Sequence, residues 1–248
     1  MDTTPWRTTL EGCRILRCKA WRPSLEQPKP DIRFVEARLR RRLSMLSSMA
    51  LHTLHALGPL PAHCPLFFVS FRGELNQQLK VNRMLFEEGA LLPAAFSLSV
   101  FNTPPALCCM ALGLKAGYAA LYPAENGFPF ALAAAAAALK TPGGRPVDGT
   151  TQAASPLPST PPLPPYLAFL YADELPAPEY ASLLTGPQPE ALAFALLLAG
   201  PAASGEGREE AGREGLALPT LPPADCQSPQ HFWAALAAHF GPNGVPHV

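Results

Sequence analysis

The sequence predicts an α/β fold, a single layered unit in which helices cover a mostly parallel, mixed sheet. Short apolar runs alternate along the chain with segments whose apolar residues recur at steps of three and four, which favours strands alternating with helices. Residues 65–70 form a continuous apolar run, so we expect that strand to be covered on both faces. Helices between strands act as crossover connections and favour parallel pairing, while antiparallel pairing stays open for the late strands.

The predicted strands are short apolar runs between turn signals. They lie at residues 13–21, 65–70, 118–122, 166–171 and 191–198. Residues 96–100 are expected to form an irregular or strand-like approach to Asn102.

The first long helix is predicted by an apolar stripe that stops at the helix-breaking pair Gly58-Pro59. The stripe consists of Leu39, Leu43, Leu46, Ala50, Leu54 and Leu57. A second amphipathic helix, with Leu75, Leu79, Met84 and Leu85 facing inward, is expected to end at Gly89. Three further helices are predicted at residues 103–112, 128–140 and 229–239, the first capped by Asn102 or Thr103 and the last by Ser228.

Residues 1–248 are expected to form one domain with two long flexible loops. The loops, residues 141–165 and about 200–224, are rich in proline, glycine and other small or charged residues, which favour irregular chain over packed elements.

Composition and charge narrow the classes of function. The formal net charge is zero, which argues against a general nucleic-acid binder. The longest apolar run, residues 128–139, is too short to span a bilayer, and the first residues lack the pattern of a secretory signal. The six cysteines show no metal-ligand spacing. We therefore expect a cytoplasmic protein with reduced thiols, no membrane span, no metal and no cofactor.

Five segments, taken in order, resemble one protein family. They are residues 39–51, 70–75, 96–102, 113–127 and 171–174. Together they resemble the short β-ketoacyl synthase-like N-terminal domain proteins, which are similar to the chain-length-factor partners of aryl polyene and other type II polyketide systems. The resemblance implies a thiolase-like half, that is, one half of the duplicated fold of the condensing enzymes, without the half that carries the catalytic histidines.

The resemblance gives one position particular weight. In β-ketoacyl synthases a cysteine lies at the turn between a strand and a helix, and Glu125 falls on that position when the segment is aligned from Asn102 and Gly113. A carboxylate cannot form the acyl thioester that condensation needs. Three roles stay open for Glu125: capping the following helix, plugging or shaping a partner's active-site region, and acting as a catalytic group in malonyl decarboxylation or acyl transfer.

The chain also departs from the family pattern near this turn. Phe101 stands where the resemblance implies a histidine, and Asn126 alters the turn itself. The pocket and turn candidates are therefore Phe101, Asn102, Glu125 and Asn126.

Two segments are candidates for contacts with other proteins. In ketosynthases the strand equivalent to residues 118–122 pairs with its counterpart across the dimer axis, which makes Tyr118, Ala120 and Tyr122 dimer-strand candidates. The alternative is an ordinary internal strand. The arginines Arg38, Arg41 and Arg42 are candidates for docking an acidic acyl carrier protein, and the alternative is a solvated helix face.

Two other groups are expected to carry no chemistry. Cys108 and Cys109 lie inside a short apolar helix, where cysteine behaves as a small hydrophobe rather than as a nucleophile. Arg72 and Glu74 are expected to form a structural pair at the turn after the second strand.

The resemblance thus implies a non-catalytic, chain-length-factor-type subunit. Such a subunit forms a heterodimer with a full-length β-ketoacyl synthase in polyketide biosynthesis of the aryl polyene kind, or in fatty-acid-like biosynthesis. Two alternatives stay open: a malonyl decarboxylase or acyl-transfer enzyme that uses Glu125, and a scaffolding homodimer.

Overall fold

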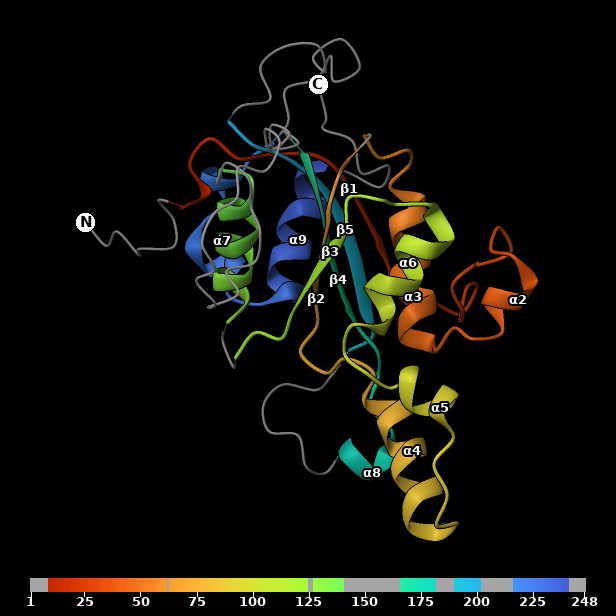
Figure 1. The fold of residues 1–248 in the computed structure, drawn as a ribbon. Helices are drawn as coiled ribbons and strands as arrows, with labels where there is room; N and C mark the ends of the chain where they lie inside the picture. Colours follow the sequence, from red (N-terminus) through yellow and green to blue (C-terminus); the bar gives the residue numbers. More distant parts are fainter. Residues whose placement is uncertain are drawn as a thin grey trace, which may run out of the picture.

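The fold is built around one six-stranded sheet with helices on both faces (Figure 1). The structure, a computed structural model, describes residues 9–61, 63–124, 127–140, 166–181, 190–201 and 216–240. In spatial order the strands are β3 (Tyr118–Leu121), β2 (Leu66–Val69), β4 (Tyr166–Asp173), β5 (Leu192–Ala199), β1 (Arg14–Trp21) and β6 (Leu216–Ala217).

The sheet is mixed, as predicted, with a smaller parallel part than expected. Strand β2 pairs in parallel with β3 and β4, whereas the β4–β5, β5–β1 and β1–β6 pairs are antiparallel. The chain passes from β4 to its immediate neighbour β5 in the opposite direction, so this step does not require a crossover to the far end of the sheet.

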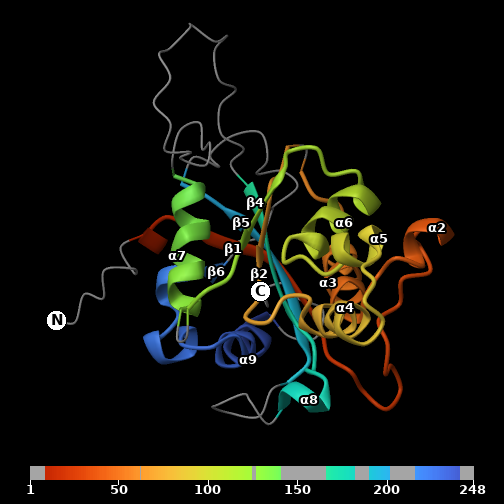
Figure 2. The same ribbon diagram turned by 60° about the horizontal axis from the view of Figure 1, so that its bottom comes forward.

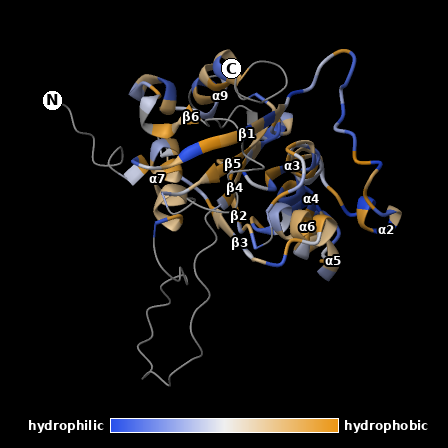
Figure 3. Cartoon of the chain, turned by 90° about the horizontal axis from the view of Figure 1, so that it is seen from above, coloured by the Kyte–Doolittle hydropathy of each residue, from blue (hydrophilic) through white to orange (hydrophobic). Residues whose placement is uncertain are grey.

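Two hydrophobic clusters, one on each face of the sheet, hold the layers together. Helices α3 (Met45–Ala56) and α6 (Thr103–Leu112) cover one face, and α7 (Phe128–Ala138) and α9 (Pro229–Phe240) cover the other (Figures 1 and 2). Every residue of β5 is buried, which explains why its sequence shows no polar alternation. Seen from above, the sheet and α3 are rich in hydrophobic residues (Figure 3).

Four helices lie outside these layers: α2 (Ala37–Arg40), α4 (Leu75–Glu87), α5 (Pro93–Ser97) and α8 (Pro178–Ala181). The 3-10 turns η1 (Leu218–Thr220) and η2 (Pro223–Cys226) contribute Leu218 and Cys226 to the hydrophobic cluster on the side of α7 and α9. Helices α4 and α5 project away from the sheet beside α8 (Figures 1 and 2). We call residues 75–97, which contain α4 and α5, the α4–α5 arm.

The first long helix is shorter than predicted because a serine cap interrupts it. Ser44 has an extended backbone, and its Oγ accepts a hydrogen bond from the Ser47 amide at 2.8 Å. The apolar stripe continues through this break, so its period does not reveal it. Helix α3 therefore begins at Met45, and Leu39 lies in the separate helix α2.

The second amphipathic helix forms, but its apolar side is only partly covered: Leu75, Leu79 and Met84 are half-buried. In α4, all of which the structure describes, Val81 is the one buried residue, and Leu85 is exposed. The period correctly predicts an amphipathic helix, which contacts α5, and the prediction that Leu85 faces inward is wrong.

Two segments expected to be irregular contain regular structure. Residues 93–97 form α5, so the approach to Asn102 begins as a helix rather than a strand. Within the predicted loop at about 200–224, residues 216–217 form β6, which extends the sheet beyond β1, and η1 follows directly. The predicted loop at residues 141–165 lies outside the described residues.

Candidate functional site

The strand-to-helix connection that the sequence singles out is formed by β3 and α7. Strand β3 ends at Leu121, Gly127 occupies the N-cap position of α7, and its amide donates to the Ala124 carbonyl at 2.7 Å. Glu125 and Asn126 lie outside the described residues, so their proposed roles stay predictions. The flanking elements have the predicted order, a strand followed by an alanine-rich helix.

Phe101 packs over the turn that follows β2. Its ring centroid lies 5.9 Å from that of Phe68 in β2 and 6.1 Å from that of Tyr122 after β3. Gly73 in the turn has φ of 54°, and a Cβ atom there would lie 2.6 Å from Cδ2 of Phe101. The phenylalanine that replaces the expected histidine thus makes an apolar contact across the ends of β2 and β3.

Asn102 contacts the other end of β3. Its Nδ2 donates to the Tyr118 hydroxyl at 3.2 Å, and its side chain forms no cap hydrogen bond to α6, whose N-cap position it occupies. Asn102 therefore occupies the predicted N-cap position of α6, but its side chain does not form the expected capping hydrogen bond. The structure brings four candidates together as two neighbouring pairs, Phe101 with Tyr122 and Asn102 with Tyr118.

In the part of the chain that the structure describes, β3 is an edge strand and not an internal one. The carbonyls of Gly117 and Leu121 accept hydrogen bonds from the Leu66 and Ser70 amides of the β2 side, at 3.1 and 3.4 Å. Because alternate residues of a strand direct their backbone groups to opposite sides, the three dimer-strand candidates direct theirs away from β2. These are Tyr118, Ala120 and Tyr122. Within the described residues no strand pairs with that side.

Apolar side chains are exposed on the elements that lead to this edge. Helix α5 precedes α6, and α6 packs beside β3. Met110 of α6 and Tyr122 are each 64% exposed, and Phe86 at the end of α4 is 83% exposed. The other exposed apolar residues on these elements and on the loop between α4 and α5 are Leu85, Leu91, Leu92, Phe96 and Tyr118. Concentrations of this kind mark surfaces that bind another molecule.

The arginine candidates gather on and just after α2. Arg38 lies in α2, Arg41 is the C-cap residue and Arg42 follows, and all three are exposed. They belong to a short separate helix and not to the face of a long one.

An open pocket of about 460 Å³ lies between α3 and the loop that precedes α2. It is lined by Asp31, Arg33, Phe34, His52, His55 and Ala56. The rings of Phe34 and His55 stack at 3.6 Å, and His52 Nδ1 lies 2.8 Å from the Asp31 carbonyl oxygen. No motif indicated this pocket, because its walls come from residues 31–34 and from one side of α3.

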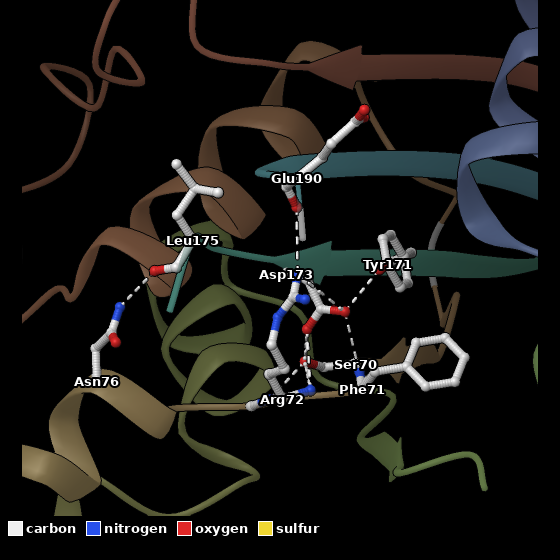
Figure 4. Close-up of polar contacts among 9 residues, drawn as sticks. Ser70, Phe71, Arg72, Asn76, Tyr171, Asp173, Leu175 and Glu190 are labelled. Atoms are coloured by element: carbon white, nitrogen blue, oxygen red, sulfur yellow. Dashed lines mark hydrogen bonds and ion pairs between the residues drawn. The ribbon is translucent and has the colours of Figure 1, made fainter. Parts of the chain in front are cut away.

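A buried carboxylate links the carboxyl ends of β2 and β4 (Figure 4). Asp173 accepts hydrogen bonds from the Ser70 hydroxyl at 2.7 Å, from the Tyr171 hydroxyl at 2.6 Å and from the amides of Phe71 and Arg72. Burial, followed by the charge of Asp173, raises the pKa of Tyr171, so its hydroxyl stays a donor. The network satisfies Asp173 internally and fixes the turn that carries Gly73.

The expected pair of Arg72 and Glu74 does not form. The Arg72 guanidinium lies 3.9 Å from Asp173 and donates to the Glu190 carbonyl at 3.2 Å. Glu74 instead accepts from the hydroxyls of Ser44 and Ser47, each at 2.7 Å. The carboxylate points to α3 rather than along the turn, which sequence spacing alone does not reveal.

Burial makes the adjacent cysteines poor nucleophiles. It raises the pKa of the Cys108 thiol strongly, with a smaller contribution from Cys109, and it also raises the pKa of Cys109. Because the thiolate is the reactive form, these shifts oppose catalysis at either position. Among the described residues there is also no group of three metal-ligating side chains, and no helix there is long and apolar enough to cross a membrane.

Comparison with solved structures identifies proteins of similar fold. The chain is similar to a ketosynthase (ApeO) in complex with its chain length factor (ApeC) from Xenorhabdus doucetiae, with a TM-score of 0.57, 16% identity and coverage of 77% of this chain and 80% of that chain. It is also similar to a β-ketoacyl synthase from Burkholderia phymatum STM815, with a TM-score of 0.52 and 12% identity. That match covers 84% of this chain but only 56% of the Burkholderia chain.

A third similar structure is a type II PKS acyl-carrier protein in complex with its ketosynthase bound to the hexaketide (AntDE:AntF), with a TM-score of 0.48 and 14% identity. The match covers 76% of this chain and 63% of that chain.

The likeness to the Burkholderia structure shows a fold that matches one half of a thiolase-like ketosynthase. No curated protein sequence matches this chain. Residues 17–147, more than half of the chain, match the family described as "Beta-ketoacyl synthase, N-terminal domain". The chain therefore belongs to the β-ketoacyl synthase N-terminal domain family.

Proposed function

We propose that this chain is a chain-length-factor-type subunit that forms a heterodimer with a full-length β-ketoacyl synthase. The observation that carries the proposal is the edge strand β3, whose outward backbone groups find no partner strand among the described residues. Exposed apolar side chains lie on β3 itself, at Tyr118, and after it, at Tyr122, and Met110 is exposed on the adjacent helix α6. A strand edge with an apolar margin is suited to strand pairing with another protein.

The similar structure from Xenorhabdus doucetiae supports the class of partner, because it contains a ketosynthase with its chain length factor. At 16% identity this likeness shows only the fold, so the argument for pairing depends on the edge itself. We assign the pathway to polyketide biosynthesis, and within it to the aryl polyene kind, because the resemblance of the five sequence segments implies it.

The residue type at position 125 indicates which of the two subunits would perform condensation. Glu125 aligns with the cysteine that carries the acyl group in β-ketoacyl synthases, and a carboxylate cannot replace that thiol. The partner then performs condensation, and this chain supplies part of the wall around the growing chain. Phe101, which packs against Phe68 and Tyr122, gives that wall an apolar character near the edge strand.

We assign carrier-protein docking to the exposed arginines Arg38, Arg41 and Arg42. Acyl carrier proteins are acidic, and a cluster of exposed positive charge raises the rate of encounter with such a partner. The arginines belong to α2 and its C-terminal turn, so they are presented apart from the β3 edge.

The proposal is tested by co-purification with a full-length β-ketoacyl synthase from the same organism. We expect a heterodimer for the native chain and for Ala120→Thr, but not for Ala120→Pro. Proline removes the outward amide and cannot donate across the edge, whereas threonine keeps the amide and suits a strand. The β2–β3 hydrogen bonds use the other residues of β3, so the Ala120→Pro chain should still fold.

The alternatives give different results in the same experiment. A homodimer that ignores the synthase would support scaffolding and reject the proposal. Equal binding of both Ala120 variants would show that β3 does not form the interface.

A further inference from the structure

Two buried glutamates lie where the α4–α5 arm joins the rest of the fold. Glu74, the N-cap residue of α4, is completely buried, and Glu174, which follows β4 directly, is 6% exposed. Oε2 of Glu74 and Oε1 of Glu174 have no hydrogen-bond partner among the described residues. A carboxylate oxygen that is buried without a donor is costly, and this attachment contains two of them.

The surroundings do not supply a cation in direct contact with either of these oxygens. Ser44 and Ser47 of α3 donate to the other oxygen of Glu74. The Arg72 guanidinium lies beside Asp173, and Lys80 of α4 donates to Gln77. Lys80 and Arg72 therefore act on the pair only through their more distant charge.

We infer that the two buried glutamates, Glu74 and Glu174, retain a proton while the arm is packed, and that losing this proton loosens the arm. A protonated carboxyl carries no charge, so one proton removes one of the two like charges that are buried at this attachment. The inferred role of this proton is to hold the arm in place and not to act on a substrate.

The pKa shifts of Glu74 and Glu174 agree with the burial of both carboxyl groups. Burial, followed by the charge of Glu74, raises the pKa of Glu174 from 4.5 to about 7, despite the opposing influence of Asn76, Lys80 and Arg72. Burial also raises the pKa of Glu74, against the hydrogen bonds from Ser44 and Ser47 and the charge of Lys80. The proton is therefore lost near neutral pH and not in acid.

The α4–α5 arm can respond to loss of the proton because polar contacts dominate its attachment to the rest of the fold. Besides the Glu74 bonds, Asn76 donates to the Leu175 carbonyl at 2.8 Å and accepts from the Ala177 amide at 2.7 Å. Further out, Arg83 forms an ion pair with Glu179 of α8. Helix α4 fully buries only Val81, and Leu75, Leu79 and Met84 are half-buried, so less apolar burial opposes opening of α4 than of α3.

The sign of the pH effect follows from linkage. In the open arm the carboxyl group is hydrated and its pKa returns towards 4.5, whereas in the closed arm it is about 7. The closed form therefore binds the proton more tightly, and opening becomes easier as pH rises between these values. Above about pH 7 both forms are ionised and the effect levels off.

Hydrogen exchange of the native chain, corrected for intrinsic rates, tests this inference. We expect the opening constant of α4 amides to rise about tenfold between pH 5.5 and pH 7.5, while β4 and β5 amides change less. Glu174→Gln, which keeps the shape and removes the charge, should abolish the rise. Glu179→Gln is the matched control, because it breaks only the surface pair with Arg83 and should keep the rise.

Glu74→Gln is a second neutral variant, should Glu174→Gln fold poorly, and it should reduce the rise, because the contribution of the Glu74 charge to the pKa of Glu174 is lost while that of burial remains. The inference is overturned if the native chain shows no rise, or if a folded neutral variant keeps the native slope. None of these readouts uses a ketosynthase, so this inference and the proposed heterodimer can fail separately.

Discussion

Phe101 and Gly73 show how one side chain constrains a backbone 28 positions away in the chain. The aromatic ring lies against the backbone of Gly73, and that glycine has a positive φ. Both features exclude a side chain at position 73, the first by space and the second by conformational preference. The glycine is therefore needed because of Phe101 as well as because of its turn.

Gly73→Ala should destabilise the protein by about 2–4 kcal/mol, since the strained φ and the overlap with Phe101 both oppose it. Chemical denaturation measures this loss. In a Phe101→Ala background the same substitution should cost at least about 1 kcal/mol less, because only the backbone strain remains. An equal cost in both backgrounds would show that the ring contact does not restrict position 73.

The Asp173 network illustrates what residue patterns miss. The segment around Tyr171 and Asp173 was marked only by a family resemblance, and its partner Ser70 lies 103 positions earlier. Sequence spacing cannot show that β2 and β4 are neighbours, so it paired Arg72 with nearby Glu74 instead of Asp173. The actual partners become evident only once the two parallel strands are aligned.

At the scale of elements, the buried strands were predicted well. Strands β2, β4 and β5 are continuous apolar runs because helices cover both faces of the sheet. The ends of helices were also predicted where a local signal marks them, as at Gly113, which ends α6 with φ of 66°. The break before α3 was missed because Leu39 and Leu43 keep the apolar period across it.

Amphipathic period predicted the existence of α4 but not its surroundings. Period reveals that one side of a helix is apolar, and it contains no information about which element covers that side. Leu85 was therefore expected to face inward and is exposed. The same limitation hid α5, whose five residues are too few to show a period.

The arginine cluster around α2 provides an element-scale test. Replacing Arg38, Arg41 and Arg42 together by glutamine should slow the association of an acyl carrier protein several-fold at low ionic strength, because three steering charges are lost. Stopped-flow fluorescence measures the rate, and high salt serves as the control because it screens the charges. A loss of the same size at high salt would point to a structural role for these residues.

At the scale of the whole molecule, the sequence predicts the layered α/β class, but it does not predict the order of the strands in the sheet. Alternating strand and helix patterns predicted helices on both sides of a mixed sheet. The position of β1 beside β5, and of β6 beyond it, depends on long-range antiparallel pairing that no local pattern encodes. The edge position of β3 was likewise open. Among the described residues it excludes an ordinary internal strand, and the interface with another chain stays a prediction.

The candidate site is thus only partly accounted for by sequence. Resemblance identified Phe101, Asn102 and the β3 residues, and the fold brings them together in pairs. Resemblance also selected Glu125, whose role remains a prediction because that residue lies outside the described part of the chain. The glutamate pair at the arm was not expected, because Glu74 and Glu174 meet only through the fold.

Residue-resolved hydrogen exchange of β3, with and without a full-length β-ketoacyl synthase, tests the central claim most directly. The amides of Tyr118, Ala120 and Tyr122 face outward and should exchange fast in the isolated chain. On addition of the synthase they should become strongly protected, while the inward amides of Ala119 and Leu121 are protected from the start. Unchanged exchange of the outward amides in a mixture that contains the synthase would contradict the account.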